Sequence, residues 1–322
     1  MGRLLFRRLL QGLPLVLGVI VLNFVLIQAA PGSLLDVMTA EQQISDPAMI
    51  ARLRVLYGMD DPAWLQLLKY IWSVLQLDFG FSYRQNMPVL DVILSQLPAT
   101  LILMLSSMGL ALLVGVTAGV VAAVKVNSLW DNLLSFLAVF FFAAPSFWLG
   151  IMLIILFSVK LGWLPVGGMT TIGADPGAWG AALDVLQHMV LPTLTLGLFY
   201  AAVYARVMRA AMLEVFSLDF VRTAQAKGLG RARVVIRHVL RNALLPIVTL
   251  FGLQLGTVLG GSVVVETVFS WPGIGSLLLD SVSSRNYPVV LGVLVLGSLV
   301  VVLANILVDL AYTRLDPRIR GR

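Results

Sequence analysis

Six uninterrupted apolar stretches constrain this chain more than any other feature of its sequence. Each contains at least 21 residues and no Asp, Glu, Lys or Arg. A helix needs about 20 residues to cross the hydrocarbon core of a bilayer, so every stretch is long enough to span it. The sequence therefore predicts an all-α polytopic membrane protein with six transmembrane helices. The stretches are Leu9–Ala29, Leu97–Val124, Leu133–Val159, Val185–Ala205, Asn242–Val265 and Asn286–Val308.

The positions of the basic residues predict how the chain is oriented. Only 12% of the residues are charged, far below the share in a soluble domain. Six of the 22 Lys and Arg residues fall in segments that would lie outside if the N-terminus is cytoplasmic: Arg52, Arg54, Lys69, Arg84, Lys160 and Arg285. The positive-inside rule then places both termini in the cytoplasm. Because the net charge of +6 follows membrane sidedness, a nucleic-acid surface is disfavoured.

The apolar stretches divide the chain into four regions. Residues 1–30 are interpreted as a retained N-terminal transmembrane helix, with a cleaved signal peptide as the alternative. Residues 31–94 form an extracytoplasmic section with interfacial helices, because Asp46-Pro47 and Asp61-Pro62 each start a helix. Residues 95–313 hold five helices and a cytoplasmic loop, 206–241. Residues 314–322 form a basic cytoplasmic tail.

The second of these interfacial helices, residues 62–77, is amphipathic. Its apolar side chains recur at spacings of three and four, which places them on one helical face. Tryptophan is favoured at membrane interfaces, so this helix is expected to lie along the bilayer surface. The apolar side chains are Trp64, Leu68, Ile71, Trp72 and Leu75.

Glycines at four-residue spacing occur in the second and fifth stretches. Small residues let membrane helices approach closely where apolar burial gives no driving force. Close helix packing is the role expected for Gly115, Gly119, Gly252, Gly256 and Gly260.

Chemistry that needs ionisable or metal-binding side chains has little support in this sequence. Proton- or sodium-driven carriers generally need ionisable groups inside the membrane, and the six stretches contain no Asp, Glu, Lys or Arg. The chain has no cysteine, two histidines, and no GxxxxGK[ST], HExxH or GxSxG motif, so no ATP site, metal site or enzyme active site is predicted. His188 is interpreted as an interfacial histidine with its hydrogen bonds satisfied. Two function classes remain for this chain: a transport conduit whose energy is supplied by another protein, and a purely structural subunit.

The cytoplasmic loop is the most specific part of the sequence. Ser217 or Asp219 is expected to cap a short helix that ends at Lys227-Gly228, with Gly228 in the left-handed conformation. A second helix should run from Arg231 toward Pro246. Small residues at Ala224 and Ala226 would allow another protein to approach the first helix closely.

At this point the sequence resembles the permease subunits of type I ABC importers, specifically the B-type permease of the dipeptide/oligopeptide/nickel family. The loop sequences Phe220–Leu229 and His238–Pro246 resemble that family's EAA loop, although Arg222 and Thr223 stand where the general pattern has Glu and Ala. Shorter motifs extend the resemblance over nearly the whole chain: Tyr57–Trp64, Leu97–Leu101, Pro145–Trp148, Glu266–Gly275, Tyr287–Val289 and Asp316–Arg318.

The resemblance implies a heteromeric importer in a bacterial inner membrane, with residues 95–313 as an ABC transmembrane type-1 core. The implied partners are a companion (C-type) permease, two cytoplasmic ATP-binding subunits, an extracytoplasmic solute-binding protein and membrane lipid. ATP and Mg would bind to the partners, and this chain would bind no cofactor and catalyse no reaction. The residues implied to couple to the ATPase are Arg222, Thr223, Ala224, Ala226, Lys227, Gly228, Leu229 and Gly230; residues 222–230 are the coupling segment below.

The end of the fifth stretch is expected to lie at the outer mouth of the pathway. A carboxylate at that depth is costly unless it reaches water or a partner, which favours a gate or a binding-protein contact at Glu266. The alternative is that Glu266 extends to the interface and Pro272-Gly273 makes a turn. The residues of this candidate outer gate are Glu266, Phe269, Trp271, Pro272 and Gly273. The sequence does not identify the substrate. Two rival functions are also open: a secondary carrier or channel, and a non-transporting scaffold.

Overall fold

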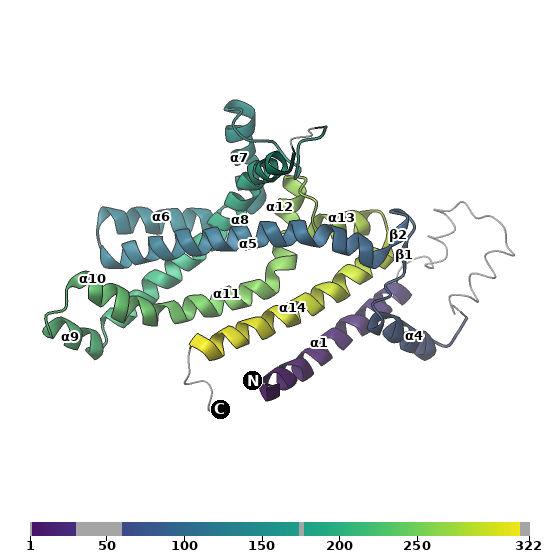
Figure 1. Cartoon of the computed structure of the whole chain (residues 1–322), viewed down its shortest axis with the longest axis horizontal. Coiled ribbons are helices and arrows are strands. Elements are labelled where there is room, and N and C mark those ends of the chain that lie inside the picture. Colours follow the sequence, from purple (N-terminus) through teal and green to yellow (C-terminus); the bar gives the residue numbers. More distant parts are fainter. Residues whose placement is uncertain (1, 30–59, 174–176, 316–322) are drawn as a thin grey trace. The chain divides into compact units, whose positions relative to one another are not determined.

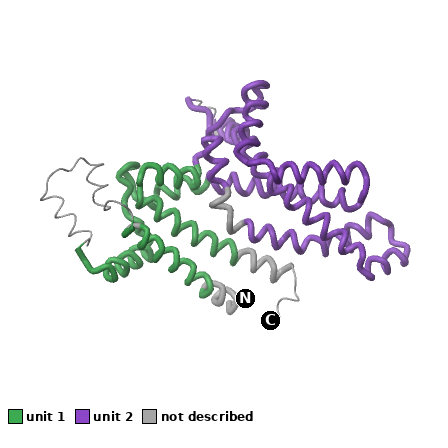
Figure 2. The backbone as a smooth tube through the Cα atoms, turned by 180° about the vertical axis from the view of Figure 1, so that it is seen from behind, with its two compact units in different colours: residues 1–98, 273–322 green, residues 99–272 purple. Residues whose placement is uncertain are grey.

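The computed structural model describes residues 2–29, 60–173 and 177–315, which are built almost wholly of helices (Figure 1). The chain divides into two compact units, one of residues 1–98 with 273–322 and one of residues 99–272 (Figure 2). Helix α5 (Val89–Val124) contributes residues to both units.

The first unit consists of helices with one small hairpin. Helix α1 packs along α14, and α4 packs against α1. The hairpin is fixed to the start of α14 by Asn286, whose Nδ2 donates to Ser82 Oγ and to Gln85 Oε1, both at 2.9 Å. The elements are α1 (Gly2–Ala29), α4 (Ala63–Leu75), β1 (Phe81–Ser82), β2 (Met87–Pro88), α13 (Ile274–Ser283) and α14 (Tyr287–Leu315).

The second unit is organised around α8, which packs against α6, α7, α11 and α12. Its core includes the fully buried side chains of Tyr204, Met208 and Met212 on α8. Helices α9 and α10 lie together at one end of the unit (Figure 1). The elements are α6 (Leu129–Ala143), α7 (Ser146–Leu153), the π-helix η1 (Ile154–Lys160), α8 (Gly177–Phe216), α9 (Asp219–Ala226), α10 (Arg231–Arg233), the π-helix η2 (Val234–Leu240), α11 (Arg241–Gly261) and α12 (Val263–Val268).

The helical architecture that the apolar stretches predict is confirmed. Fewer than the six predicted spans can be identified among the described residues by helix length and apolar composition. Four helical segments of the described residues are long and apolar enough to cross a membrane: Val89–Val124, Trp179–Phe216, Arg231–Gln254 and Tyr287–Ile306. A fifth is present if the bent pair α6 and α7–η1 counts as one span, and α1 contains the shorter apolar helix Leu10–Leu26.

The third apolar stretch differs most from its prediction as one continuous span. Its two helical parts meet at an angle of 106°. Proline disfavours the helical conformation of the residue before it, and Ala144 is extended, with ψ at 126°, ahead of Pro145. Pro145 then precedes the first turn of α7, where its missing N–H costs nothing.

Helix α4 confirms the amphipathic helix predicted between the first two stretches. Trp64 and Trp72 are 64% and 65% exposed in the isolated chain, and both lie in the apolar stripe. The helix predicted after Asp46-Pro47, the motif residues Tyr57–Met59 and the motif Asp316–Arg318 lie outside the described residues.

The exposed stripe predicts that lipid covers α4. The chain lacks cysteine, so a fluorophore on Trp72→Cys reports one site only. In vesicles, this label should be shielded from an aqueous quencher. A label on Lys69→Cys, which is exposed on the same helix outside the stripe, should be quenched readily. Equal quenching at both positions would remove the interfacial assignment.

Candidate functional site

The coupling segment consists of the second half of helix α9 and the turn that follows it. Gly228 has a φ of +76°, which confirms the left-handed glycine predicted there. The predicted side-chain cap is wrong: Leu218 is the N-cap residue, and no side chain caps the helix. The Ser217 hydroxyl instead donates to the carbonyl of Glu214, at the end of α8.

The two faces of α9 have different surroundings. Val221 and Ala224 are buried in the cluster that α9 forms with α8 and η2. The expectation that Ala224 allows a partner to approach is therefore wrong for this conformation, because its methyl group packs on the chain itself. Leu229 is half-buried against the same cluster. The exposed members of the coupling segment are Arg222, Thr223, Gln225, Ala226, Lys227, Gly228 and Gly230.

Glu266 lies in α12 and is completely buried within the second unit. Its Oε1 accepts a hydrogen bond from Thr100 Oγ1 at 2.9 Å. The alternative in which this carboxylate extends to the interface is therefore wrong. The structure places the carboxyl group in a polar contact between α5 and α12 instead.

The residues after Glu266 are fastened into the second unit. Trp271 is fully buried, and its Nε1 donates to the carbonyl of Ala99 at 2.9 Å. The buried Phe269 accepts a hydrogen bond through its carbonyl from the backbone N–H of Gly168 at 2.7 Å. Gly273 is also buried, so Pro272 is the one member of the candidate outer gate whose side chain is exposed.

Two of the predicted packing glycines lie where α5 approaches α8. A Cβ added at Gly115 would be 2.6 Å from the carbonyl oxygen of Ala201, and one at Gly119 would be 2.6 Å from Met208 Cβ. Both distances are shorter than real Cβ atoms allow. Gly252 is buried, whereas the side-chain surroundings of residues 255–261, which include Gly256 and Gly260, lie outside the described set.

His188 has an acidic neighbour that the sequence interpretation overlooked. Asp184 lies one helical turn earlier in α8, and the two side chains approach to 3.3 Å between Nδ1 and Oδ1. The Asp184 carboxylate also accepts from the backbone N–H and the hydroxyl of Thr171, both at 2.7 Å. The histidine is therefore satisfied by a local network that also holds the loop before α8.

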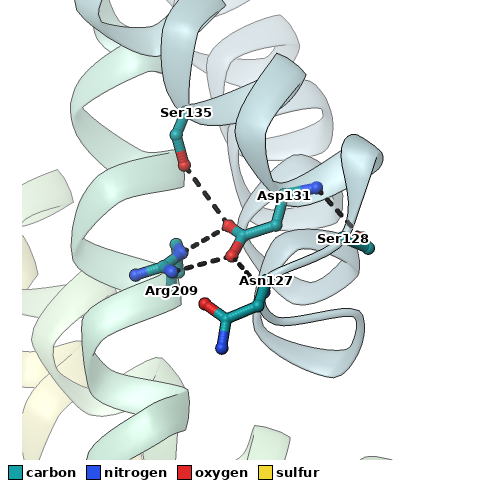
Figure 3. A network of polar contacts seen from close by, with 5 residues as sticks. All are labelled: Asn127, Ser128, Asp131, Ser135 and Arg209. Carbon is teal, nitrogen blue, oxygen red and sulfur yellow. Dashed lines mark hydrogen bonds and ion pairs between the residues drawn. The ribbon is translucent and has the colours of Figure 1, made fainter.

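The sequence pattern does not predict an ion pair of the second unit in which the carboxylate is buried and the arginine is half-buried (Figure 3). Arg209 Nε and Nη2 donate to Asp131 Oδ1 and Oδ2 at 2.7 and 2.8 Å, and Asp131 is only 2% exposed. The available signal is that Asp131 lies two residues before the third apolar stretch. Arg209 falls in the predicted cytoplasmic loop 206–241, where membrane sidedness alone accounts for a positive charge.

Comparison with known proteins assigns the chain to a family. The family model for the binding-protein-dependent transport system inner membrane component matches residues 115–321. The chain belongs to this family. A second model, for the N-terminal part of such membrane components, matches residues 1–104. The permease is therefore a multi-pass inner-membrane component of an ABC importer and not a catalytic enzyme, which confirms the family resemblance read from its motifs.

Curated relatives match the permease over its whole length. It is 43% identical over 328 residues to the di/tripeptide transport system permease protein of Pseudomonas aeruginosa, covering 98% of this chain and 97% of that protein. It is 41% identical over 339 residues to the dipeptide transport system permease protein of Escherichia coli K12, with both chains fully covered. The glutathione transport system permease protein of Escherichia coli O1:K1 is 43% identical over 314 residues, covering 98% of this chain and 97% of that one.

A solved structure shares the fold of the permease. The MetNI methionine ABC transporter in an inward-facing conformation superimposes with a TM-score of 0.53 at 20% sequence identity. The match covers 70% of this chain and 96% of that chain. This likeness supports the ABC importer permease fold.

Proposed function

We propose that the permease forms half of the translocation pathway of an ATP-driven importer for peptides or related small solutes. The relatives named for di/tripeptide, dipeptide and glutathione transport support this substrate class. In this arrangement six spans cross the membrane and both termini are cytoplasmic. Residues 1–30 form the first span, 31–94 the outer section, 95–313 the transport core and 314–322 the tail.

The partners complete what this chain lacks. A companion permease forms the other half of the pathway, two cytoplasmic subunits bind ATP and Mg, and an extracytoplasmic solute-binding protein delivers the solute. The coupling segment docks on an ATP-binding subunit. The observation that carries this proposal is the exposed edge of α9 and its turn, which ends in Lys227 and the left-handed Gly228.

Cysteine substitution tests the docking and the topology together, because the natural chain has no cysteine to remove. A thiol crosslinker on Gln225→Cys, which is exposed on α9, should join the permease to an ATP-binding subunit in the assembled complex. Ser283→Cys, exposed on α13, should give no such crosslink and should react with an impermeant reagent from outside. Reversed labelling would overturn the topology, and an active complex without the Gln225→Cys crosslink would overturn the docking.

Glu266 belongs to the proposed outer gate, although its side chain is buried inside the second unit and does not reach the surface. Replacing Glu266 by Gln keeps the shape of the side chain but exchanges the carboxyl group that accepts from the Thr100 hydroxyl for a neutral amide. We expect lower uptake and weaker stimulation of ATP hydrolysis by the binding protein, at unchanged expression. Val264→Ala, exposed on the same helix, is the control and should behave as the wild type. Identical kinetics of Glu266→Gln and wild type at every binding-protein concentration would leave Glu266 a structural role only.

A further inference from the structure

The turn between α5 and α6 is fastened to the helix that leads into the coupling segment. Asp131, in the first turn of α6, is held by both arms of the Arg209 guanidinium from α8 (Figure 3). The same carboxylate accepts from the backbone N–H of Asn127 at 2.9 Å and from Ser135 Oγ at 3.3 Å. A bidentate Arg–carboxylate pair fixes orientation as well as distance, so α6 and its turn follow α8.

The same turn is also fastened to the helix that leaves the coupling segment. Arg231, the first residue of α10, donates through Nη2 to the carbonyl of Val124 at 2.8 Å. Val124 is the last residue of α5. Residues 125–128 are therefore held from α8, which precedes α9, and from α10, which follows it. Both contacts lie within the second unit.

We propose that Asp131, Arg209 and Arg231 are positioning residues that make the α5–α6 turn move with the coupling helix α9. The inference rests on the proposed docking of α9 to an ATP-binding subunit. A displacement of α9 reaches α8 and α11 through the continuous chain. It reaches α5 and α6 through their packing on α8 and also through these two polar links, which join residues 78 and 107 positions apart in sequence. What the two links add is a hold on the α5–α6 turn itself, so that the turn and the adjoining ends of α5 and α6 follow α9 when it moves.

Arg231 offers the cleanest test because it is exposed, so its loss leaves no buried charge. In the complete purified importer in vesicles, Arg231→Gln should lower the solute imported per ATP hydrolysed by about tenfold, the lower end of the scale for one charged hydrogen bond. Basal ATP hydrolysis and recovery of the complex should not change. Arg233→Gln is the matched control: it removes the same charge from the same short helix, and no hydrogen bond or ion pair of Arg233 is found among the described residues. Equal import per ATP in the two variants would overturn the proposal.

The Asp131–Arg209 pair gives a second, independent measurement. Asp131→Asn and Arg209→Gln should each lower import per ATP, and the double variant should be no worse than the poorer single variant, because both act through one contact. Additive losses would contradict a shared role. If Asp131→Asn does not assemble, Arg231→Gln still decides the question.

Crosslinking separates this proposal from the docking on which it rests. The Gln225→Cys crosslink to the ATP-binding subunit should persist at wild-type yield in the Arg231→Gln background. Loss of that crosslink in Arg231→Gln alone would show that Arg231 serves docking, which overturns its positioning role. Absence of the crosslink in the otherwise wild-type complex would overturn the docking itself.

Discussion

Gly228→Asp is expected to abolish ATP-driven uptake while the permease still inserts and assembles with its companion permease. Gly228 has a φ of +76°, a region that costs residues with a Cβ about 1–2 kcal/mol. No atom lies within 4 Å of the position where its Cβ would be, so the chain itself has room for the side chain. The new carboxylate would instead project from the exposed turn into the proposed contact with the ATP-binding subunit.

The matched control separates the charge from the backbone effect. Asn tolerates the left-handed region about as well as Asp and is nearly the same size, so Gly228→Asn should retain much of the uptake. Lys227→Glu reverses a charge on the same exposed turn and should also abolish uptake. Uptake measured in vesicles with the full complex checks all three variants. Normal transport by both Gly228→Asp and Lys227→Glu would remove the coupling role of this turn.

Gly119→Val is expected to destabilise the second unit strongly. The first added carbon alone would lie 2.6 Å from Met208 Cβ and 2.7 Å from the carbonyl oxygen of Ala205. Because α8 is the centre of that unit, α5 cannot move away without opening its core. We expect a loss of about 3 kcal/mol in unfolding free energy, the upper part of the range for overpacked sites.

Gly109→Val is the control for this prediction, since Gly109 lies in the same helix and a Cβ there has nothing within 4 Å. Thermal unfolding in detergent should show a large fall for Gly119→Val and little change for Gly109→Val. Similar unfolding temperatures in the two variants would contradict the close approach of α5 and α8.

The sequence predicts the helices well because their cause is local. The apolar stretches and the amphipathic pattern of residues 62–77 depend on composition and spacing alone. The break at Pro145 was not predictable in the same way, because Pro98 and Pro192 lie inside the continuous helices α5 and α8. Whether a proline kinks a helix or ends it is decided by the packing of the parts on either side.

The candidate sites were predictable only where one residue determines the geometry. Gly228 is such a residue, because a helix that ends in a left-handed residue usually has Gly at that position. The burial of Ala224, in contrast, depends on η2, and the partner of Glu266 is Thr100, which is 166 residues away in sequence. The pairing of Asp131 with Arg209 spans 78 residues. No local spacing encodes contacts of this kind.

The most direct test of the central claim is solute uptake by vesicles that contain defined sets of subunits. In vesicles that contain both permeases, the ATP-binding subunits and the solute-binding protein, we expect uptake of a dipeptide or related solute. This uptake should require ATP on the side of the membrane that carries the ATP-binding subunits. Omitting the ATP-binding subunits or ATP should abolish it. Uptake by this chain, alone or with its companion permease, without any ATP-binding subunit would show a secondary carrier or channel and would contradict the account.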